Sequence, residues 1–226
     1  MRYCLLLIGF LLSFTAWAEE ESAATTEQKY IEGTHYQRML AQVPTIVPAD
    51  KVEIAEIFRF GCPACFKFEG AYQTWSETKP PFIEFVKNPV IWDKTTEIHA
   101  KVYFTAEVLG VEKEMAQAIF EAIHEKATTR KEAMNAMTDD EVIMATFEKL
   151  GADKDKAMKV YSSFGIKSKV NQADGRARAF AVSGTPEIVV DGQYRVTTST
   201  AGSFEQMLAI ATYLAEKAAK EKGLLE

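Results

Sequence analysis

Two cysteines carry the clearest chemical signal in this chain. Cys62 and Cys65 stand three residues apart in the segment Gly61-Cys62-Pro63-Ala64-Cys65-Phe66, and Cys4 is the one other cysteine among the 226 residues. Residues i and i+3 lie on the same face of a helix. A Cys-x-x-Cys at the start of a helix therefore brings two sulfurs to disulfide distance without moving the backbone. The spacing predicts a dithiol that can open and close as a disulfide.

Other uses of such a pair are less well supported by the sequence. A bridge between residues three apart closes too small a loop to constrain much of the unfolded chain, which argues against a structural disulfide. A zinc tetrad would need further ligands, but there is no second cysteine pair, and His35, His99 and His124 lack the usual ligand spacing. We predict redox chemistry and no metal site, with a packed, inert cysteine pair as the alternative.

The first 18 residues predict export from the cytoplasm. Arg2 supplies a positive start, residues 5–14 form an apolar stretch too short to span a bilayer, and Ala16-Trp17-Ala18 fits a small-x-small cleavage site. An uncleaved anchor is the alternative, which the length disfavours. Cleavage would remove Cys4 and leave only the pair, in an oxidising compartment where disulfides persist.

Composition excludes some classes of function. The net charge is −6, and no long basic run provides an electrostatic footprint for nucleic acid. No later stretch is long and apolar enough to predict a membrane helix. The length suits one large domain, or one domain with an insertion.

The elements around the cysteines follow from hydrophobic patterning. Residues 51–60 are mostly apolar, as in a central strand covered on both faces. Pro63 suits the first position of a helix, which we expect to run to about Trp75. Residues 82–91 predict the next strand, and a first strand is expected between residues 36 and 46.

The second half of the chain predicts a helical block and then a hairpin. Helical periodicity extends for about ninety residues after Trp92, with one helix expected to end near Gly165 and the next to start at Ile166. Strand patterns return on both sides of Asp191-Gly192, a pair typical of a tight hairpin turn. A last helix is expected after Ser203.

This order of elements predicts an α/β chain with a thioredoxin-like fold. A first strand precedes a strand–helix–strand unit, which is followed by the helical block, a hairpin and a helix. We place an inserted all-helical subdomain at about residues 94–182.

The sequence resembles the DsbA-like periplasmic thiol–disulfide oxidoreductases. The resemblance rests on the exported N-terminus, on Phe58-Arg59-Phe60-Gly61-Cys62-Pro63-Ala64-Cys65, on the helical insertion and on Gly184-Thr185-Pro186 before the final hairpin. It covers nearly all of the mature chain, which we take as residues 19–226 after a signal peptide at 1–18.

The two cysteines are expected to have different roles. Cys62, at the helix N-terminus, gains from the helix dipole and free N–H groups, so its thiol pKa falls and it becomes the nucleophile. Cys65, one turn further in, is the more buried resolving thiol. We expect Pro63 and Ala64, together with Thr185, to contact substrate. The resemblance implies that many relatives carry His at the position of Ala64.

Pro186 resembles the cis-proline of this family, which packs against the dithiol. A trans turn proline is the alternative. Thr185 would offer its backbone to an extended substrate segment by β-augmentation, with its side chain facing the sulfurs.

Glu56 stands six residues before Cys62 in an otherwise apolar strand. A buried carboxylate is costly unless it is paired, and Lys87 in the neighbouring strand is the expected partner. The resemblance implies that Glu56 assists proton transfer at Cys65. A purely structural Glu56–Lys87 pair is the alternative, and the sequence leaves both open.

The function implied is enzymatic. The chain would introduce disulfides into reduced or unfolded exported proteins in the periplasm, as a monomer, with the Cys62–Cys65 disulfide as its redox group and no other cofactor. The resemblance implies reoxidation by a quinone-linked membrane partner of the DsbB type.

Two other functions stay open at this point. One is a disulfide isomerase or reductase that is kept reduced. Ala64 and Thr185 do not decide between this function and an oxidase. The other is a binding protein or chaperone with a vestigial dithiol, which the intact Cys62, Cys65 and Pro186 disfavour.

Overall fold

A five-stranded mixed sheet forms the centre of the molecule. The computed structural model describes residues 29–226, so the predicted signal peptide lies outside the described residues. The strands, in the spatial order β1-β5-β4-β2-β3, are β1 (Gln37–Arg38), β2 (Val52–Phe58), β3 (Ile83–Pro89), β4 (Glu187–Val190) and β5 (Tyr194–Thr197). β2 and β3 are parallel, and the other neighbouring pairs are antiparallel.

β2 is the central strand that its apolar sequence predicts. All seven of its residues are buried, since β3 and β4 flank it and helices cover both of its faces. Ile54 packs with α1 (Pro63–Ser76) and α9 (Phe204–Glu221), whereas Ile57 packs with α7 (Phe164–Ala179) on the opposite face. Alternate residues of this strand therefore face different helices.

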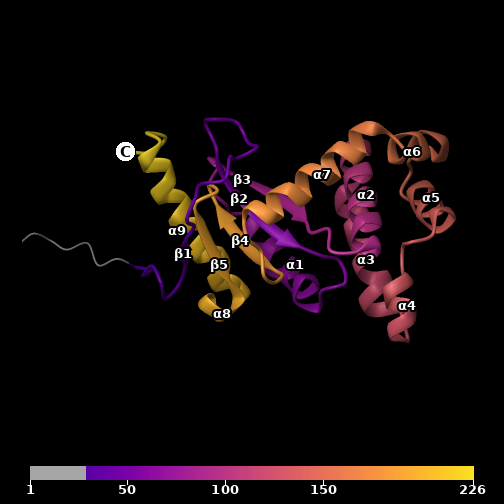
Figure 1. Ribbon diagram of the computed structural model, residues 1–226, viewed down its shortest axis with the longest axis horizontal. Coiled ribbons are helices and arrows are strands. Elements are labelled where there is room, and N and C mark those ends of the chain that lie inside the picture. The colour runs from indigo at the N-terminus through magenta and orange to yellow at the C-terminus, as the bar shows by residue number, and fades with distance from the viewer. Residues whose placement is uncertain (1–28) are drawn as a thin grey trace, which may run out of the picture.

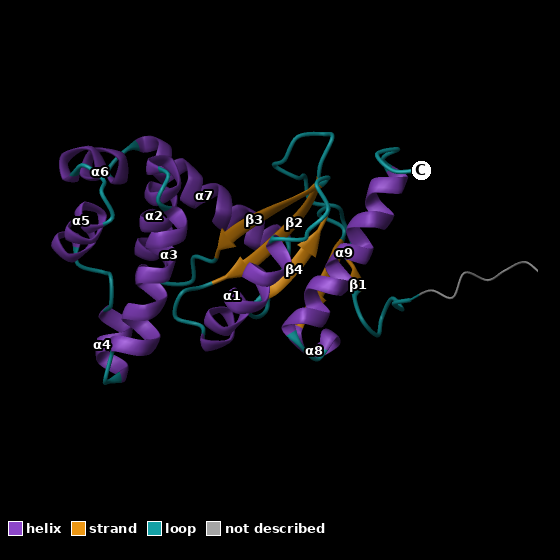
Figure 2. Ribbon diagram, turned by 180° about the vertical axis from the view of Figure 1, so that it is seen from behind, coloured by secondary structure: helices purple, strands orange, loops and turns teal. Residues whose placement is uncertain are grey.

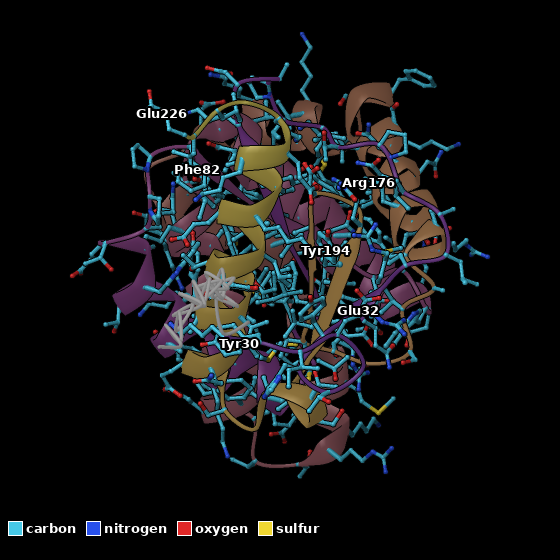
Figure 3. All side chains as sticks on the ribbon, turned by 90° about the vertical axis from the view of Figure 1, so that its left-hand side faces the viewer. Tyr30, Glu32, Phe82, Arg176, Tyr194 and Glu226 are labelled. Carbon is cyan, nitrogen blue, oxygen red and sulfur yellow. The ribbon has the colours of Figure 1, made fainter. Side chains whose placement is uncertain are left out.

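The predicted first strand is much shorter than expected. Only Gln37–Arg38 pair with β5, although Met39 N and Val43 N still donate to the carbonyls of Gln193 and Gly192. The prolines further along this segment have no N–H to offer a sheet, so the chain continues as a loop along the hairpin. Tyr30, at the start of the described chain, lies beside α9 and accepts a hydrogen bond from Gln206 (Figure 3).

The segment between β3 and β4 is helical, as predicted. It comprises α2 (Lys94–Leu109), α3 (Glu112–Glu121), the π-helical turn η1 (Ala122–Lys126), α4 (Arg130–Asn135), α5 (Asp140–Lys149), α6 (Lys154–Tyr161) and α7. Helices α2 to α6 lie beyond one end of the sheet, and α7 returns from them to cover it (Figure 1). The short α8 (Thr198–Ala201) then leads into α9. The predicted fold class is confirmed.

The predicted break between two helices is confirmed, but it lies before Gly165. Helix α6 ends at Tyr161, and Gly165 lies in the first turn of α7, which starts at Phe164. Ser163 sets this start, since its hydroxyl accepts a hydrogen bond from Ile166 N. The hairpin turn at Asp191-Gly192 is confirmed, with φ values of 49° and 64°.

The core of the insertion is continuous with the segment that carries the cysteines. Phe58 and Phe60 pack in one cluster with Tyr103 and Phe120 of the insertion, and both cysteines belong to that cluster. Figure 2 shows the loop between β2 and α1 extending toward α3. The insertion thus forms one side of the surroundings of the dithiol. No helix within residues 29–226 is long and apolar enough to cross a membrane.

Candidate active site

Cys62 is the N-cap of α1, with extended backbone angles (φ −95°, ψ 114°), and Pro63 starts the helix. Its sulfur accepts a hydrogen bond from the amide of Cys65 at 3.4 Å and lies 3.2 Å from the carbonyl oxygen of Thr185. Cys62 is 7 % exposed and Cys65 is fully buried, so Cys62 is the more accessible of the two. The helix start delivers one sulfur to the surface and buries the other.

The surroundings of Cys62 favour its thiolate. A side-chain hydrogen bond from Cys65 contributes most, and it outweighs the burial that opposes the charge. The side chain of Thr185 and the amides of Cys65 and Ala64 add to it. Together these donors lower the pKa of Cys62 from 9.0 to about 5. At neutral pH this sulfur is an anion.

Cys65 has the opposite electrostatics. Burial raises the pKa of its thiol far above the ordinary range, and the hydrogen bond to Cys62 and the negative charge of Glu56 raise it further. The reduced site therefore holds one thiolate and one thiol, and the Cys65 thiol donates a hydrogen bond to the Cys62 thiolate. Both cysteines are unbridged in this structure, which represents the reduced form.

The Thr185–Pro186 peptide bond is cis, as predicted. Glu187 anchors the residues just before it, since one of its carboxylate oxygens accepts hydrogen bonds from Ser183 N, Ser183 Oγ and Gly184 N. This anchor fixes the loop that carries the Thr185 carbonyl to Cys62. The sequence reasoning missed Glu187, although an acidic residue directly after the Thr185-Pro186 motif, at the start of a buried strand, could have indicated it.

Glu56 is fully buried on the face of β2 that carries α1. The expected partner is confirmed, with Lys87 Nζ 3.6 Å from a Glu56 carboxylate oxygen and the two residues paired in register across β2 and β3. Neither carboxylate oxygen of Glu56 has a hydrogen-bond partner within the described chain. A buried carboxylate left so poorly solvated is one that readily takes up a proton.

Glu69 of α1 is a third member of this cluster, and its carboxylate also pairs with Lys87. Burial raises the pKa of Glu56 to about 7, although Lys87 opposes it, and the charge of Glu69 adds to the rise. Sequence reasoning missed Glu69, yet it stands four residues after Cys65 on the same helix face, a spacing that could have revealed it.

Comparison with known proteins agrees with this geometry. Residues 82–215 match the family described as DSBA-like thioredoxin domain. The thiol:disulfide interchange protein DsbA of Pseudomonas aeruginosa is 36 % identical over 208 residues, which cover 92 % of this chain and 94 % of that protein. The chain belongs to the DsbA-like family.

Other members of the family give the same picture. DsbA of Azotobacter vinelandii is 34 % identical over 217 residues, covering 94 % of this chain and 96 % of the relative. The crystal structure of Pseudomonas aeruginosa DsbA has a TM-score of 0.76 and 34 % identity, with 86 % of this chain and 97 % of that one covered. DsbA of Xylella fastidiosa has a TM-score of 0.74 and 28 % identity over 84 % and 98 % of the two chains. The chain is thus a thiol:disulfide oxidoreductase, as its sequence predicts.

A groove next to the active site of this DsbA-like enzyme reaches the charged cluster. It has a volume of about 1220 Å³ and lies between α1, β3 and the helices of the insertion. Lys87, Glu69 and Tyr72 line it, whereas Glu56 does not. Lys87 and Glu69 therefore stand between the buried carboxylate and solvent.

The substrate-contact residues predicted from sequence lie around Cys62. Pro63 is exposed, and Ala64 and Thr185 are half-buried. Within residues 29–226 no three His, Cys, Asp or Glu side chains are grouped so as to hold a metal ion.

We predict that the reduced protein loses stability as the pH falls from about 9 to about 5. The folded pKa of Cys62 is about 5, against an ordinary value of 9.0. When folding lowers the pKa of an acid, the folded protein gains stability that is fully present above the pKa of the unfolded chain. This stability is lost as the pH falls through the pKa of the folded protein. Each pKa unit corresponds to about 1.4 kcal/mol.

Denaturant unfolding of the reduced wild type and of Cys62→Ser across this pH range measures the effect. The wild type should be the more stable at pH 9, and the difference in unfolding free energy should shrink as the pH approaches 5. A difference that stays constant with pH would contradict the assignment of the thiolate to Cys62.

Proposed function

We propose that the chain oxidises pairs of thiols in reduced exported proteins by transferring the Cys62–Cys65 disulfide to them. The observation that carries this proposal is the contrast between a Cys62 thiol with a pKa of about 5 and a Cys65 thiol with a strongly raised pKa. Stabilising the Cys62 thiolate stabilises the reduced enzyme relative to its disulfide, which makes the disulfide a better oxidant.

The transfer takes place in two exchange steps. A substrate thiolate attacks the sulfur of Cys62, the bond between Cys62 and Cys65 breaks, and Cys65 leaves with the electron pair and takes up a proton. A second substrate thiolate then attacks the substrate sulfur of the mixed disulfide, and Cys62 leaves as a thiolate. The substrate loses two electrons and two thiol protons. The enzyme gains the two electrons and keeps one proton on Cys65, and the other proton goes to solvent.

The second step benefits from the low pKa of Cys62, because a thiol of low pKa is the better leaving group. The first step needs a proton at Cys65, deep in the protein. Glu56, with a pKa raised to about 7 and a negative charge that acts on Cys65, is suited to supply it near neutral pH. Lys87 and Glu69, which line the groove, would connect Glu56 to solvent.

Thr185 would hold the substrate segment through its backbone, with Pro63 and Ala64 on the other side of the Cys62 sulfur. Such main-chain recognition tolerates many sequences, which suits an enzyme that acts on many exported proteins. The Glu187 anchor supports this proposal, since it fixes the loop that holds the Thr185 carbonyl oxygen 3.2 Å from Cys62 Sγ.

The remaining parts of the proposal concern the cellular setting. The dithiol serves as the redox group without another cofactor, the protein works in the periplasm as a monomer, and a quinone-linked membrane partner of the DsbB type reoxidises it. A role as an isomerase or reductase would require the dithiol to be kept reduced in the cell.

The redox state of the pair in cells tests the direction of the reaction. Rapid acid quenching followed by alkylation of free thiols should find Cys62 and Cys65 mainly as a disulfide, with Cys62→Ser as the control for an unbridged Cys65. A pair found mainly as free thiols would favour the isomerase or reductase instead.

We predict that Glu56→Gln slows disulfide transfer by at least about tenfold at neutral pH, because a positioned acid or base commonly contributes that much or more. The thiolate absorbance of Cys62 should stay near normal, since Lys87 keeps its pairing with Glu69.

Glu53→Gln is the matched control for this variant. Glu53 is equally buried on the same strand, but its side chain pairs with Arg176 on the opposite face. Removing one partner of a buried ion pair should cost about 3–5 kcal/mol of stability, without slowing transfer in the folded protein. Wild-type transfer rates in Glu56→Gln across the pH range would leave only the structural role for the pair.

Ala64→His should make the protein a stronger oxidant. A histidine between the cysteines can add a hydrogen bond or a positive charge for the Cys62 thiolate, and each pKa unit gained corresponds to about 1.4 kcal/mol. The equilibrium with glutathione measures the change, with Ala64→Gln as a neutral control. A potential that is unchanged or more reducing would overturn this prediction.

A further inference from the structure

His124 connects the helical insertion to the active-site loop. It lies on the π-helical turn η1, and its Nε2 is 2.7 Å from the carbonyl oxygen of Phe60, two residues before Cys62. A carbonyl oxygen can only accept a hydrogen bond, so Nε2 carries the hydrogen and donates it. Short π-helical turns are rare and often occur at functional sites.

The ring of His124 also contacts the other side of the dithiol. It stacks on Phe66, the residue directly after Cys65, with ring centroids 5.0 Å apart and planes inclined by 7°. One side chain of the insertion therefore holds the backbone before the first cysteine and the side chain after the second. In Figure 1 the loop between β2 and α1 extends toward α3, the helix that η1 continues.

The backbone between β2 and Cys62 forms a tight turn. Cys62 N donates to Arg59 O at 3.2 Å, so Phe60 and Gly61 are its two central residues. Gly61 does not adopt a positive φ here, as a type II turn would require. Glycine at this position nevertheless makes the type II form accessible, through a flip of the Phe60–Gly61 peptide.

The hydrogen bond from His124 distinguishes these two forms of the turn. A flipped peptide would point the Phe60 carbonyl away from His124. The flip would also change how the turn delivers Cys62 to the amide of Cys65 and the carbonyl of Thr185.

We propose that His124 is a positioning residue that selects the orientation of the Phe60–Gly61 peptide and thereby the contacts of the Cys62 sulfur. This inference rests on the proposed function of Cys62 as the reactive thiol. His124 contacts neither sulfur, so it acts through the turn.

His124→Gln and His124→Met form a matched pair that tests the hydrogen bond. Both side chains lose the ring stacked on Phe66, but Gln keeps an N–H donor at a similar reach, whereas Met of similar length has none. The Met variant should raise the titration midpoint of the Cys62 thiolate. It should also lower the equilibrium constant for disulfide transfer to glutathione by about three- to tenfold, the effect of one hydrogen bond of ordinary strength. The Gln variant should keep an equilibrium constant within about twofold of the wild-type value.

Gly61→Ala tests whether the turn transmits the effect. Alanine disfavours the positive φ of the flipped turn, and a Cβ at position 61 would meet no atom within 4 Å. On its own, Gly61→Ala should leave the titration midpoint of Cys62 and the equilibrium constant with glutathione at their wild-type values. Combined with His124→Met, it should restore most of the equilibrium constant that the Met variant loses. If the Met variant does not fold, His124→Phe takes its place, since it keeps the stacked ring without the donor.

Equal equilibrium constants for disulfide transfer in the Gln and Met variants would overturn the inference. So would a lowered equilibrium constant in His124→Met that Gly61→Ala does not restore. The wild type is measured in parallel. If the wild type transfers no disulfide to glutathiolate or a peptide dithiol, it is the proposed function that fails, and not the role of His124.

Discussion

The hydrogen bonds that hold a negative charge on the sulfur of Cys62 set the chemistry of this site. Their donors come from separate parts of the chain, the first turn of α1 and the loop before Pro186. β2 and β4 lie side by side in the sheet, so the segment after β2 and the segment before β4 meet at one edge. The thioredoxin-like topology thus brings together residues 123 positions apart, with the Cys62 sulfur 3.2 Å from the Thr185 carbonyl oxygen.

Two buried carboxylates on β2, those of Glu53 and Glu56, have different surroundings and therefore different roles. Glu53 faces α7, pairs with Arg176 and accepts a hydrogen bond from Ile46 N at 2.9 Å. Glu56 faces α1, has no hydrogen-bond partner for either oxygen within residues 29–226, and has a pKa raised to about 7. The arrangement around Glu56 allows exchange of a proton near neutral pH. The same strand thereby supplies one structural ion pair and one candidate proton donor.

Much of the site could be predicted because its signals are local. The dithiol spacing, the N-terminal proline of α1 and the Thr185-Pro186 motif are each read within a few residues, and the Glu56–Lys87 pair follows from placing two adjacent strands side by side. His124 could not be found in this way. Its contact with Phe60 depends on how the insertion packs against the loop after β2, which no short-range pattern encodes. The start of α7 was misplaced for a related reason, since the Ser163 cap outweighs the low helix propensity of Gly165.

Cys62 is a thiolate at neutral pH, whereas Cys65 remains a thiol. Titration of the ultraviolet thiolate absorbance of the reduced wild type tests this claim most directly, with Cys62→Ser as the blank. We expect a single step with a midpoint near pH 5 in the wild type and no step below pH 9 in the variant. A midpoint near the ordinary thiol value of 9.0, or an acidic step that persists without Cys62, would contradict it.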